Sequence, residues 1–277
     1  MSAAGTVLVT GATGTQGGAV LRGVLDRGDR PVAALVRDPA APKATALAEL
    51  GVELRRGDLS DPASLAAAFA GVDAVYAVTT PFGDGPEAEV AQGEAIVAAA
   101  EQAGLPWLVL ASVAAADRAD VPHFVSKARI ERRLAASSVP WTVVAPSYFY
   151  ENVAGAARAA AESGRLAMPL PADVPLHQVA LADLAAVVAA VLARRDEHLG
   201  VRVEVAGDAP TPAQMAAALH ASYEEQPLAE VRARSADLGA MYAFLAGEGY
   251  GIDVAAVRAR YPEVPWRTFA SWAAERV

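Results

Sequence analysis

The chain has 277 residues, 54% of them hydrophobic, and a formal net charge of −9. A chain of this length and composition can bury the core of one large domain, with or without a small appendage, and is not intrinsically disordered. The acidic excess and the lack of any block of Lys or Arg exclude nucleic acid as a partner, and the absence of cysteine excludes disulfides, thiolate metal sites and cysteine redox chemistry.

The amino-terminal residues lead directly into an apolar strand pattern. No room is left before residue 6 for the charged and apolar regions of a secretory signal. The alanine-rich stretches at residues 95–100 and 185–191 are much shorter than a bilayer-spanning helix. We therefore expect a cytoplasmic protein without membrane contact, and the lack of cysteine is compatible with a reducing compartment.

Three closely spaced glycines join the first predicted strand, residues 6–10, to the first predicted helix, residues 16–27. Gly11 lets the chain turn sharply, Gly14 lacks the Cβ that would block a pyrophosphate, and Gly17 lets the helix pack close to the strand. The unpaired amides and the dipole at the start of the helix favour an anion. We predict a dinucleotide-phosphate site here rather than a purely structural turn. The residues assigned to this site are Gly11, Thr13, Gly14, Thr15, Gln16 and Gly17.

Strands and helices alternate through the first half of the chain, which predicts a parallel sheet covered by helices on both faces. The pattern completes six strands of an α/β, doubly wound parallel Rossmann sheet. Further strands are predicted at residues 32–36, 52–56, 74–78, 107–111 and 141–145. Helices are predicted at residues 44–50 and 64–70, from the loop at 81–86 to about 103, and at 125–136.

The second half of the chain has a different character. A small helical piece at residues 155–164 and a proline-rich irregular stretch at 168–175 precede a helix at 182–192 and a strand at 201–205 that return to the sheet. Residues 212–277 are predicted to be helical, with a break at 247–251. We therefore assign residues 1–150, with about 176–206, to a nucleotide-binding Rossmann domain. Residues 151–175 and 207–277 are assigned to a smaller, mostly helical carboxyl-terminal lobe over the cofactor cleft, for a substrate or partner.

The residue after the second predicted strand selects the nucleotide. An acidic residue at this point holds the ribose hydroxyls of NAD, whereas an arginine accommodates a 2′-phosphate. The chain has Arg37 there, and Lys43 follows in the same loop, so two cations can converge on a phosphate. We predict NADP(H) as the cofactor; the alternative is a solvated Arg37 paired with Asp38.

Polar residues follow three more of the predicted strands, at the carboxyl edge where open parallel sheets bind ligands. Asp58 and Leu59 follow the third strand and can face the adenine, although Asp58 can instead cap the next turn. Thr79 and Thr80 end the fourth strand and Ser112 ends the fifth. All five are predicted to contact the cofactor.

His123 and Lys127 are spaced like the Tyr-x-x-x-Lys pair that short-chain dehydrogenases carry on the helix after strand five. In those enzymes the lysine binds the nicotinamide ribose and lowers the pKa of the tyrosine, which protonates a carbonyl. Lys127 fits the lysine position, and His123 takes the tyrosine position, where an imidazole can still donate a proton. The two are our candidate catalytic residues; the alternative for His123 is that it only lines or caps the helix.

Four segments together resemble the NmrA-like family of atypical short-chain dehydrogenases/reductases: residues 11–18, Arg37, the stretch Pro122-His123-Phe124 with Lys127, and residues 145–152. The resemblance implies a Rossmann domain with a small carboxyl-terminal lobe and NADP(H) bound by the matching residues. The matching residues that the resemblance implies as cofactor contacts include Lys127, Pro146, Tyr148 and Phe149. Some members reduce quinones, azo dyes or enone-like compounds, and others are redox-sensing regulators with little turnover.

Two functions remain open from the sequence. In the first, NADPH delivers a hydride to a small planar apolar acceptor, which Tyr148, Phe149, Tyr150 and Asn152 can bracket if they are not simply core. In the second, a catalytically weak protein senses NADP(H) and binds a protein partner. The four histidines are scattered without metal-ligand spacing, so no metal site is expected. His177 can line the cleft, and the surface is its expected place. A homodimer is left open.

Overall fold

A computed structural model describes residues 5–81 and 83–276 of the chain, which fold into two compact units. The first unit contains the described residues within Met1–Ser112, Ser126–Ala145 and Ala185–Val203. The second unit contains Val113–Val125, Pro146–Leu184 and the described residues within Glu204–Val277. Among the helices of these described residues, none is both long and apolar enough to span a bilayer.

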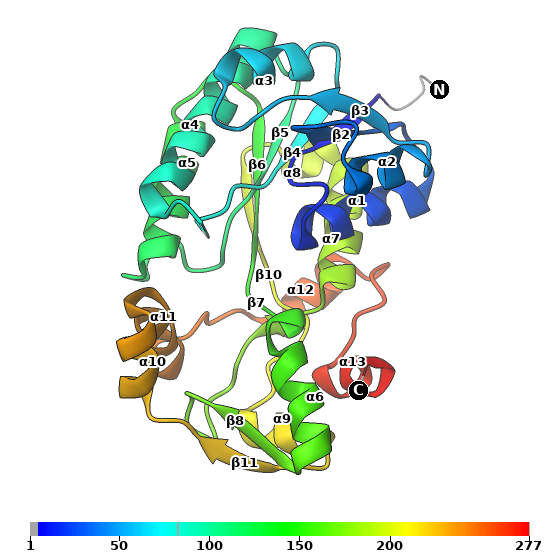
Figure 1. The fold of residues 1–277 in the computed structure, drawn as a ribbon. Coiled ribbons are helices and arrows are strands. Elements are labelled where there is room, and N and C mark those ends of the chain that lie inside the picture. Colours follow the sequence, from blue (N-terminus) through cyan, green and yellow to red (C-terminus); the bar gives the residue numbers. More distant parts are fainter. Residues whose placement is uncertain (1–4, 82, 277) are drawn as a thin grey trace. The chain divides into compact units, whose positions relative to one another are not determined.

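A seven-stranded sheet with the order β10-β6-β5-β4-β1-β2-β3 organises the first unit (Figure 1). The pairs β1–β2, β2–β3, β1–β4, β4–β5 and β5–β6 are parallel, and Val7 of the central strand is in register with Val32 on one side and Ala74 on the other. This order confirms the predicted doubly wound α/β fold, and β10 joins the sheet beside β6 as expected. The strands are β1 (Val7–Val9), β2 (Val32–Val36), β3 (Glu53–Arg56), β4 (Ala74–Ala77), β5 (Leu108–Ala111), β6 (Trp141–Pro146) and β10 (Val201–Val205).

Helices cover both faces of this sheet, as the apolar strands require. Figure 1 shows α3 (Pro62–Phe69), α4 (Pro86–Ala103) and α5 (Pro122–Ala135) on one face, where Phe69, Ile96 and Ile130 share one buried cluster with the strands. On the other face lie α1 (Thr15–Arg27), α2 (Pro42–Ala48) and α7 (Leu181–Ala193), which α8 (Arg195–His198) follows. As its sequence predicts, α3 begins at Asp61, whose carboxylate accepts hydrogen bonds from the amides of Ala63 and Ser64.

The second unit has its own buried core, which includes Phe124, Tyr150 and Trp272. Its helical elements are η1 (Tyr150–Val153), α6 (Ala154–Ser163), α9 (Pro212–Ala218), α10 (Leu228–Arg234), α11 (Ala236–Ala246), α12 (Val254–Arg260) and α13 (Phe269–Arg276). Two short parallel strand pairs accompany them: β7 (Tyr148–Phe149) with β9 (Gln178–Val179), and β8 (Arg165–Met168) with β11 (Ser222–Glu225).

The prediction that residues 212–277 are helical is wrong at β11, the stretch Ser222–Glu225. This segment has four residues and is mostly exposed, so its hydrophobic residues show neither the spacing of a helix nor the alternation of a strand. It becomes a strand because it pairs with β8, a segment far earlier in the chain, and because the Tyr223 hydroxyl donates to the Met168 carbonyl oxygen at 2.9 Å. Such a non-local pairing is not visible in a local pattern.

Candidate cofactor and active site

Three glycines shape the turn from β1 into the first turn of α1. Gly11 has φ of +61°, a conformation that glycine adopts without strain. A Cβ on Gly17 would lie 2.4 Å from the carbonyl oxygen of Gly11, and one on Gly14 would lie 3.2 Å from the same atom. The turn therefore brings the start of α1 against the end of β1, as the sequence spacing predicts.

The N-terminus of α1 is open to a ligand. Gly14 occupies the N-cap, no side chain caps the helix, and its first turn contains no acidic residue. Thr13, Gly14 and Thr15 are exposed, whereas the Gln16 side chain is held by a 3.0 Å hydrogen bond from its Nε2 atom to the Tyr76 hydroxyl. The amides of this first turn and the helix dipole thus face solvent with no side-chain anion to neutralise them, which is the arrangement that binds phosphate.

A pocket of about 320 Å³ lies at the ends of β2 and β3. Two guanidinium groups line it, those of Arg37 and Arg56, and neither forms an ion pair with any described residue. Lys43, which we expected to join Arg37, lies exposed in the first turn of α2 and is not among the lining residues. Arg56 was not singled out from the sequence, because one exposed arginine at a strand end has no distinguishing pattern. The complete lining is Arg37, Arg56, Gly57, Asp58, Asp61 and Ser64.

The two carboxylates of this pocket are engaged by their own turns. Asp58 accepts hydrogen bonds from the Ser60 amide at 2.9 Å and the Ser60 hydroxyl at 2.7 Å. The Ser60 amide, then its hydroxyl, and to a smaller extent the nearby Arg37 hold the pKa of Asp58 below its usual range, against a small opposing effect of burial. Asp61 caps α3. Asp58 therefore stabilises a turn as well as lining the pocket, and Leu59 packs half-buried against the neighbouring core.

The alternative for Arg37, an ion pair with Asp38, is not formed in the described structure. Asp38 instead accepts a 2.9 Å hydrogen bond from the amide of Ala40. Arg37 is exposed at the mouth of the pocket and interacts electrostatically with Asp58. Its guanidinium is accessible to a phosphate.

Lys127 lies in a buried polar network. Its side chain is 11% exposed, and its Nζ atom is 2.9 Å from Oε1 of Glu89, which is fully buried. The ammonium also donates to the carbonyl oxygen of Thr79 at 3.0 Å and to the Thr79 hydroxyl at 2.9 Å. The second oxygen of Glu89 accepts a hydrogen bond from the Ser126 hydroxyl. The three N–H bonds of the ammonium therefore each have an acceptor.

Burial lowers the pKa of Lys127, and the charge and hydrogen bond of Glu89 oppose this effect. Glu89 and Ser126 were missed in the sequence. A glutamate near the start of a helix normally faces solvent, and nothing in the sequence distinguishes Glu89 from the other three glutamates of this helix. Two of the predicted site residues, Thr79 and Lys127, thus contact each other directly.

Two other predicted cofactor contacts end β4 and β5. Ser112 is buried, and its hydroxyl donates to the Glu131 carboxylate, which also accepts a 2.9 Å hydrogen bond from Arg202. Thr80 is exposed. The hydroxyl of Ser112 is thus occupied by a protein carboxylate.

His123 forms a pair with a carboxylate of the second unit that was not predicted. Its Nδ1 atom is 2.7 Å from Oδ2 and 2.9 Å from Oδ1 of Asp237, and its backbone amide donates to Oδ1 at 3.1 Å. The His123 ring meets Phe124 edge-on with centroids 4.7 Å apart. Asp237 therefore fixes the orientation of the imidazole. His123 and Lys127 are one turn apart on α5, as their spacing predicts.

The aromatic residues after β6 belong mostly to the core of the second unit. Tyr148 is 7% exposed and its hydroxyl lies 2.9 Å from that of Tyr242, while Tyr150 is fully buried. Burial and the neighbouring Tyr242 raise the pKa of Tyr148 well above its usual value, so it stays protonated. Phe149 is half-buried and Pro146 is buried at the end of β6.

Asn152 and the remaining histidines do not assemble a further site. Asn152 is exposed. His177 is half-buried, and its Nε2 atom is 3.0 Å from the carbonyl oxygen of Ile252. Among residues 5–81 and 83–276, no group of three or more acidic or histidine side chains is arranged to hold a metal ion.

Comparison with known proteins places the chain beside nicotinamide-dependent enzymes. The NmrA-like family model matches residues 3–233. The NAD(P)H azoreductase of Xenophilus azovorans is 33% identical over 78% of this chain and 73% of its own length. Quinone oxidoreductase 2 of Escherichia coli is 30% identical over 77% of this chain and 73% of its own. The crystal structure of the NADPH-dependent quinone oxidoreductase QOR2 from E. coli, complexed with NADPH, has a TM-score of 0.84, with 26% identity over 97% of this chain and 99% of that one.

Proposed function

Because this chain belongs to the NmrA-like family, we propose that it is an NADPH-dependent reductase that transfers a hydride to a small planar acceptor of the quinone, enone or azo type. Relatives at 30% identity or above include an azoreductase and a quinone oxidoreductase, which supports this acceptor class. A protein of this kind needs a site for the nucleotide, a preference between NADPH and NADH, and a source of protons.

The single observation that carries the proposal is the pocket that places Arg37 and Arg56 at the ends of β2 and β3. In a Rossmann sheet the residue after the second strand contacts the adenosine ribose, so this is where a 2′-phosphate lies. Neither guanidinium has a carboxylate ion-pair partner among the described residues, and both can donate charge-assisted hydrogen bonds to a phosphate. NADH lacks that phosphate, so the two arginines of the pocket do not increase its affinity.

The pyrophosphate fits the turn between β1 and α1. The backbone of Thr13 and Gly14 is exposed there, and the amides that begin α1 have no side-chain cap. A Cβ at Gly17 would collide with Gly11, so the close approach of helix and strand depends on this glycine. Together with the arginine pocket, the turn supplies donors for the two phosphate regions of the nucleotide.

When bound, NADPH would supply the hydride. Reduction of a quinone to a hydroquinone also requires one proton, and His123 is the group that we assign to deliver it. The carboxylate of Asp237, 2.7 Å from Nδ1, orients the ring for this proton transfer. Asp237 is thus a positioning residue. Solvent reprotonates the imidazole after each turnover.

Lys127 acts in this proposal through Thr79. Its ammonium holds both the carbonyl oxygen and the hydroxyl of Thr79 and is held in turn by Glu89. It thereby fixes the carboxyl end of β4, one of the predicted cofactor contacts. Direct binding of the nicotinamide ribose by Lys127 stays a prediction.

The proposal is tested by NADPH consumption with a panel of quinones, enones and azo dyes. We expect a saturable, acceptor-dependent rate that falls at least tenfold in His123→Ala, with NADPH affinity unchanged. Arg129→Gln is the matched control, because Arg129 lies on the same helix and its ion pair with Glu87 is at the surface. No turnover above background, with nucleotide binding intact, would overturn the reductase and leave the NADP(H)-sensing regulator.

The variant Asp237→Asn shows whether Asp237 orients His123 for catalysis or only stabilises the fold. We expect a lower kcat with little change in KM, because the imidazole loses the carboxylate that orients its ring. A merely structural role would lower thermal stability without this split between kcat and KM.

A further inference from the structure

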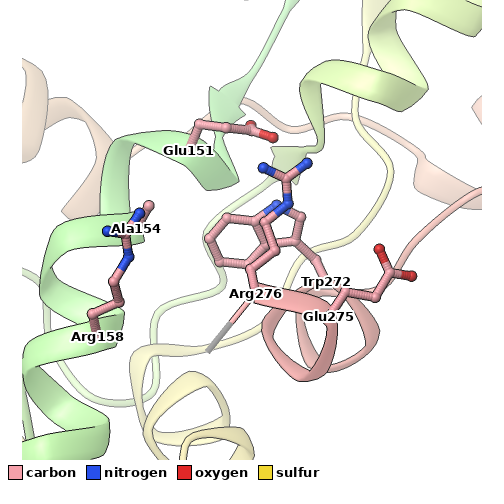
Figure 2. A pocket seen from close by; sticks show the side chains of 6 residues that line it. All are labelled: Glu151, Ala154, Arg158, Trp272, Glu275 and Arg276. Carbon is pink, nitrogen blue, oxygen red and sulfur yellow. The ribbon is translucent and has the colours of Figure 1, made fainter.

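A second cavity lies in the second unit and is lined by none of the predicted nucleotide or catalytic residues. It has a volume of about 470 Å³ and is formed by η1, α6 and α13 (Figure 2). Its size is within the range of sites for small organic molecules. The lining residues are Glu151, Ala154, Arg158, Trp272, Glu275 and Arg276.

The carboxylates of this cavity already have positive partners. Glu151 accepts hydrogen bonds from the amide of Leu181 at 3.1 and 3.3 Å, where it offsets the positive N-terminus of α7. Glu275 lies 3.5 Å from Nε of Arg267. Neither carboxylate forms an ion pair with the two arginines that line the cavity.

The two arginines, Arg158 and Arg276, are therefore the unmatched charges of the cavity. Both are exposed, and neither forms a hydrogen bond or ion pair with any residue in the described part of the chain. They come from different helices, α6 and α13, and Figure 2 shows them on opposite sides of the opening. Two guanidinium groups that line one cavity from separate helices are suited to an oxyanion with at least two acceptor oxygens.

An unsatisfied donor lies beside Arg276. Trp272 is 1% exposed, and its indole N–H has no acceptor among the described residues. A buried donor without an acceptor costs free energy and is rare in folded proteins. Trp272 and Arg276 are four residues apart on α13 and share one helix face, so an oxygen held by Arg276 would lie next to the indole edge.

We propose that this cavity binds a small organic oxyanion, a carboxylate or a phosphate ester, held by Arg158 and Arg276 with the Trp272 N–H as a third donor. The indole is fixed by packing on Tyr150 and Phe269, with ring centroids 5.5 and 5.7 Å apart, so its N–H is preorganised. The exposed arginines complete the site by moving onto the ligand. The site does not depend on the reductase proposal, because none of its residues is used there.

The test follows the indole N–H signal of Trp272 by NMR in the full chain. The chain has four tryptophans, so four indole signals are expected, and Trp272→Phe assigns the one of interest. If Trp272→Phe does not fold, backbone and side-chain assignment of the parent protein identifies the signal. Phenyl phosphate and benzoate are titrated at constant ionic strength, with benzamide as the uncharged probe.

We expect a saturable downfield shift with phenyl phosphate or benzoate and none with benzamide. The probe that binds more tightly decides between a phosphate ester and a carboxylate. Arg158→Gln and Arg276→Gln should each weaken binding at least tenfold. Arg165→Gln should not, because Arg165 is an exposed arginine of the same unit that is paired with Glu224. No saturable shift with either anion, or a shift that both cavity substitutions leave unchanged, would overturn the proposal.

Discussion

Lys127 and Arg37 are both cations of the first unit, but their surroundings are opposite. The ammonium of Lys127 is buried and has three acceptors from Glu89 and Thr79. The guanidinium of Arg37 is exposed at a pocket, and the carboxylate of Asp58, with which it interacts electrostatically, is engaged by Ser60. The first cation is committed to the fold and the second is available to a ligand. Residue type alone therefore does not identify a binding cation; its partners do.

The largest effect should come from the buried pair. Glu89→Gln leaves the Lys127 ammonium buried without its counter-charge, which typically costs about 3–5 kcal/mol. Urea unfolding of the variant measures the loss. The double variant Glu89→Gln/Lys127→Met removes the stranded charge and should recover at least half of it. A loss below about 1 kcal/mol in the single variant would show that the network contributes little to stability.

A smaller effect, on binding rather than stability, is expected at Arg37. Removing a hydrogen bond to a charged group costs about 1.5–3 kcal/mol, so Arg37→Gln should weaken NADPH binding roughly 10- to 100-fold. NADH binding should not change, and the free energy of unfolding should stay within about 0.5 kcal/mol. Calorimetric titration with both nucleotides checks this. Equal losses for NADPH and NADH would mean that Arg37 does not contact the 2′-phosphate.

Arg56 should contribute less than Arg37. It is the second guanidinium of the pocket, and an exposed ionic contact contributes up to about 1 kcal/mol, so Arg56→Gln should weaken NADPH binding roughly threefold to fivefold. Lys43→Gln is the informative control, because Lys43 does not line the pocket. If Lys43→Gln weakens NADPH binding and Arg56→Gln does not, the sequence-based pairing of Arg37 with Lys43 is correct.

The smallest effect is a change of stability with pH. Burial lowers the pKa of Lys127 in the folded protein, so as pH rises the folded chain releases this proton before the unfolded chain, whose lysines titrate near about 10.4. The unfolded state then binds more protons, and the free energy of unfolding rises with pH in that window. Urea unfolding from pH 7 to 10, compared with the double variant Glu89→Gln/Lys127→Met, isolates this contribution without leaving Glu89 buried and unpaired. Equal slopes for the two proteins would contradict the lowered pKa.

The first unit could be predicted closely from the sequence. Its strands are apolar on both faces and its helices have local start and stop signals, such as Asp61-Pro62 before α3 and Gly104 after α4. The turn at Gly11, Gly14 and Gly17 could also be predicted, because only a residue without a Cβ fits a position where the backbone turns sharply or packs closely. These features depend on near neighbours in the chain.

The partners of the site residues could not be predicted. Glu89 contacts Lys127, and Asp237 contacts His123, across long separations in sequence that leave no local pattern. Strand β11 was missed for the same reason, since it exists only through β8. The sequence identified His123 and Lys127 as candidate catalytic residues. Their hydrogen-bond and ion-pair partners are known only from the structure.

We expect the first unit to bind NADP(H) and to distinguish it from NAD(H) by the 2′-phosphate. Isothermal titration calorimetry of the folded wild-type chain with NADPH and with NADH measures this preference. One site is expected for NADPH, with a Kd at least roughly tenfold lower than that for NADH, as a charge-assisted contact to one phosphate implies. Equal affinities, or no heat with either nucleotide, would contradict it.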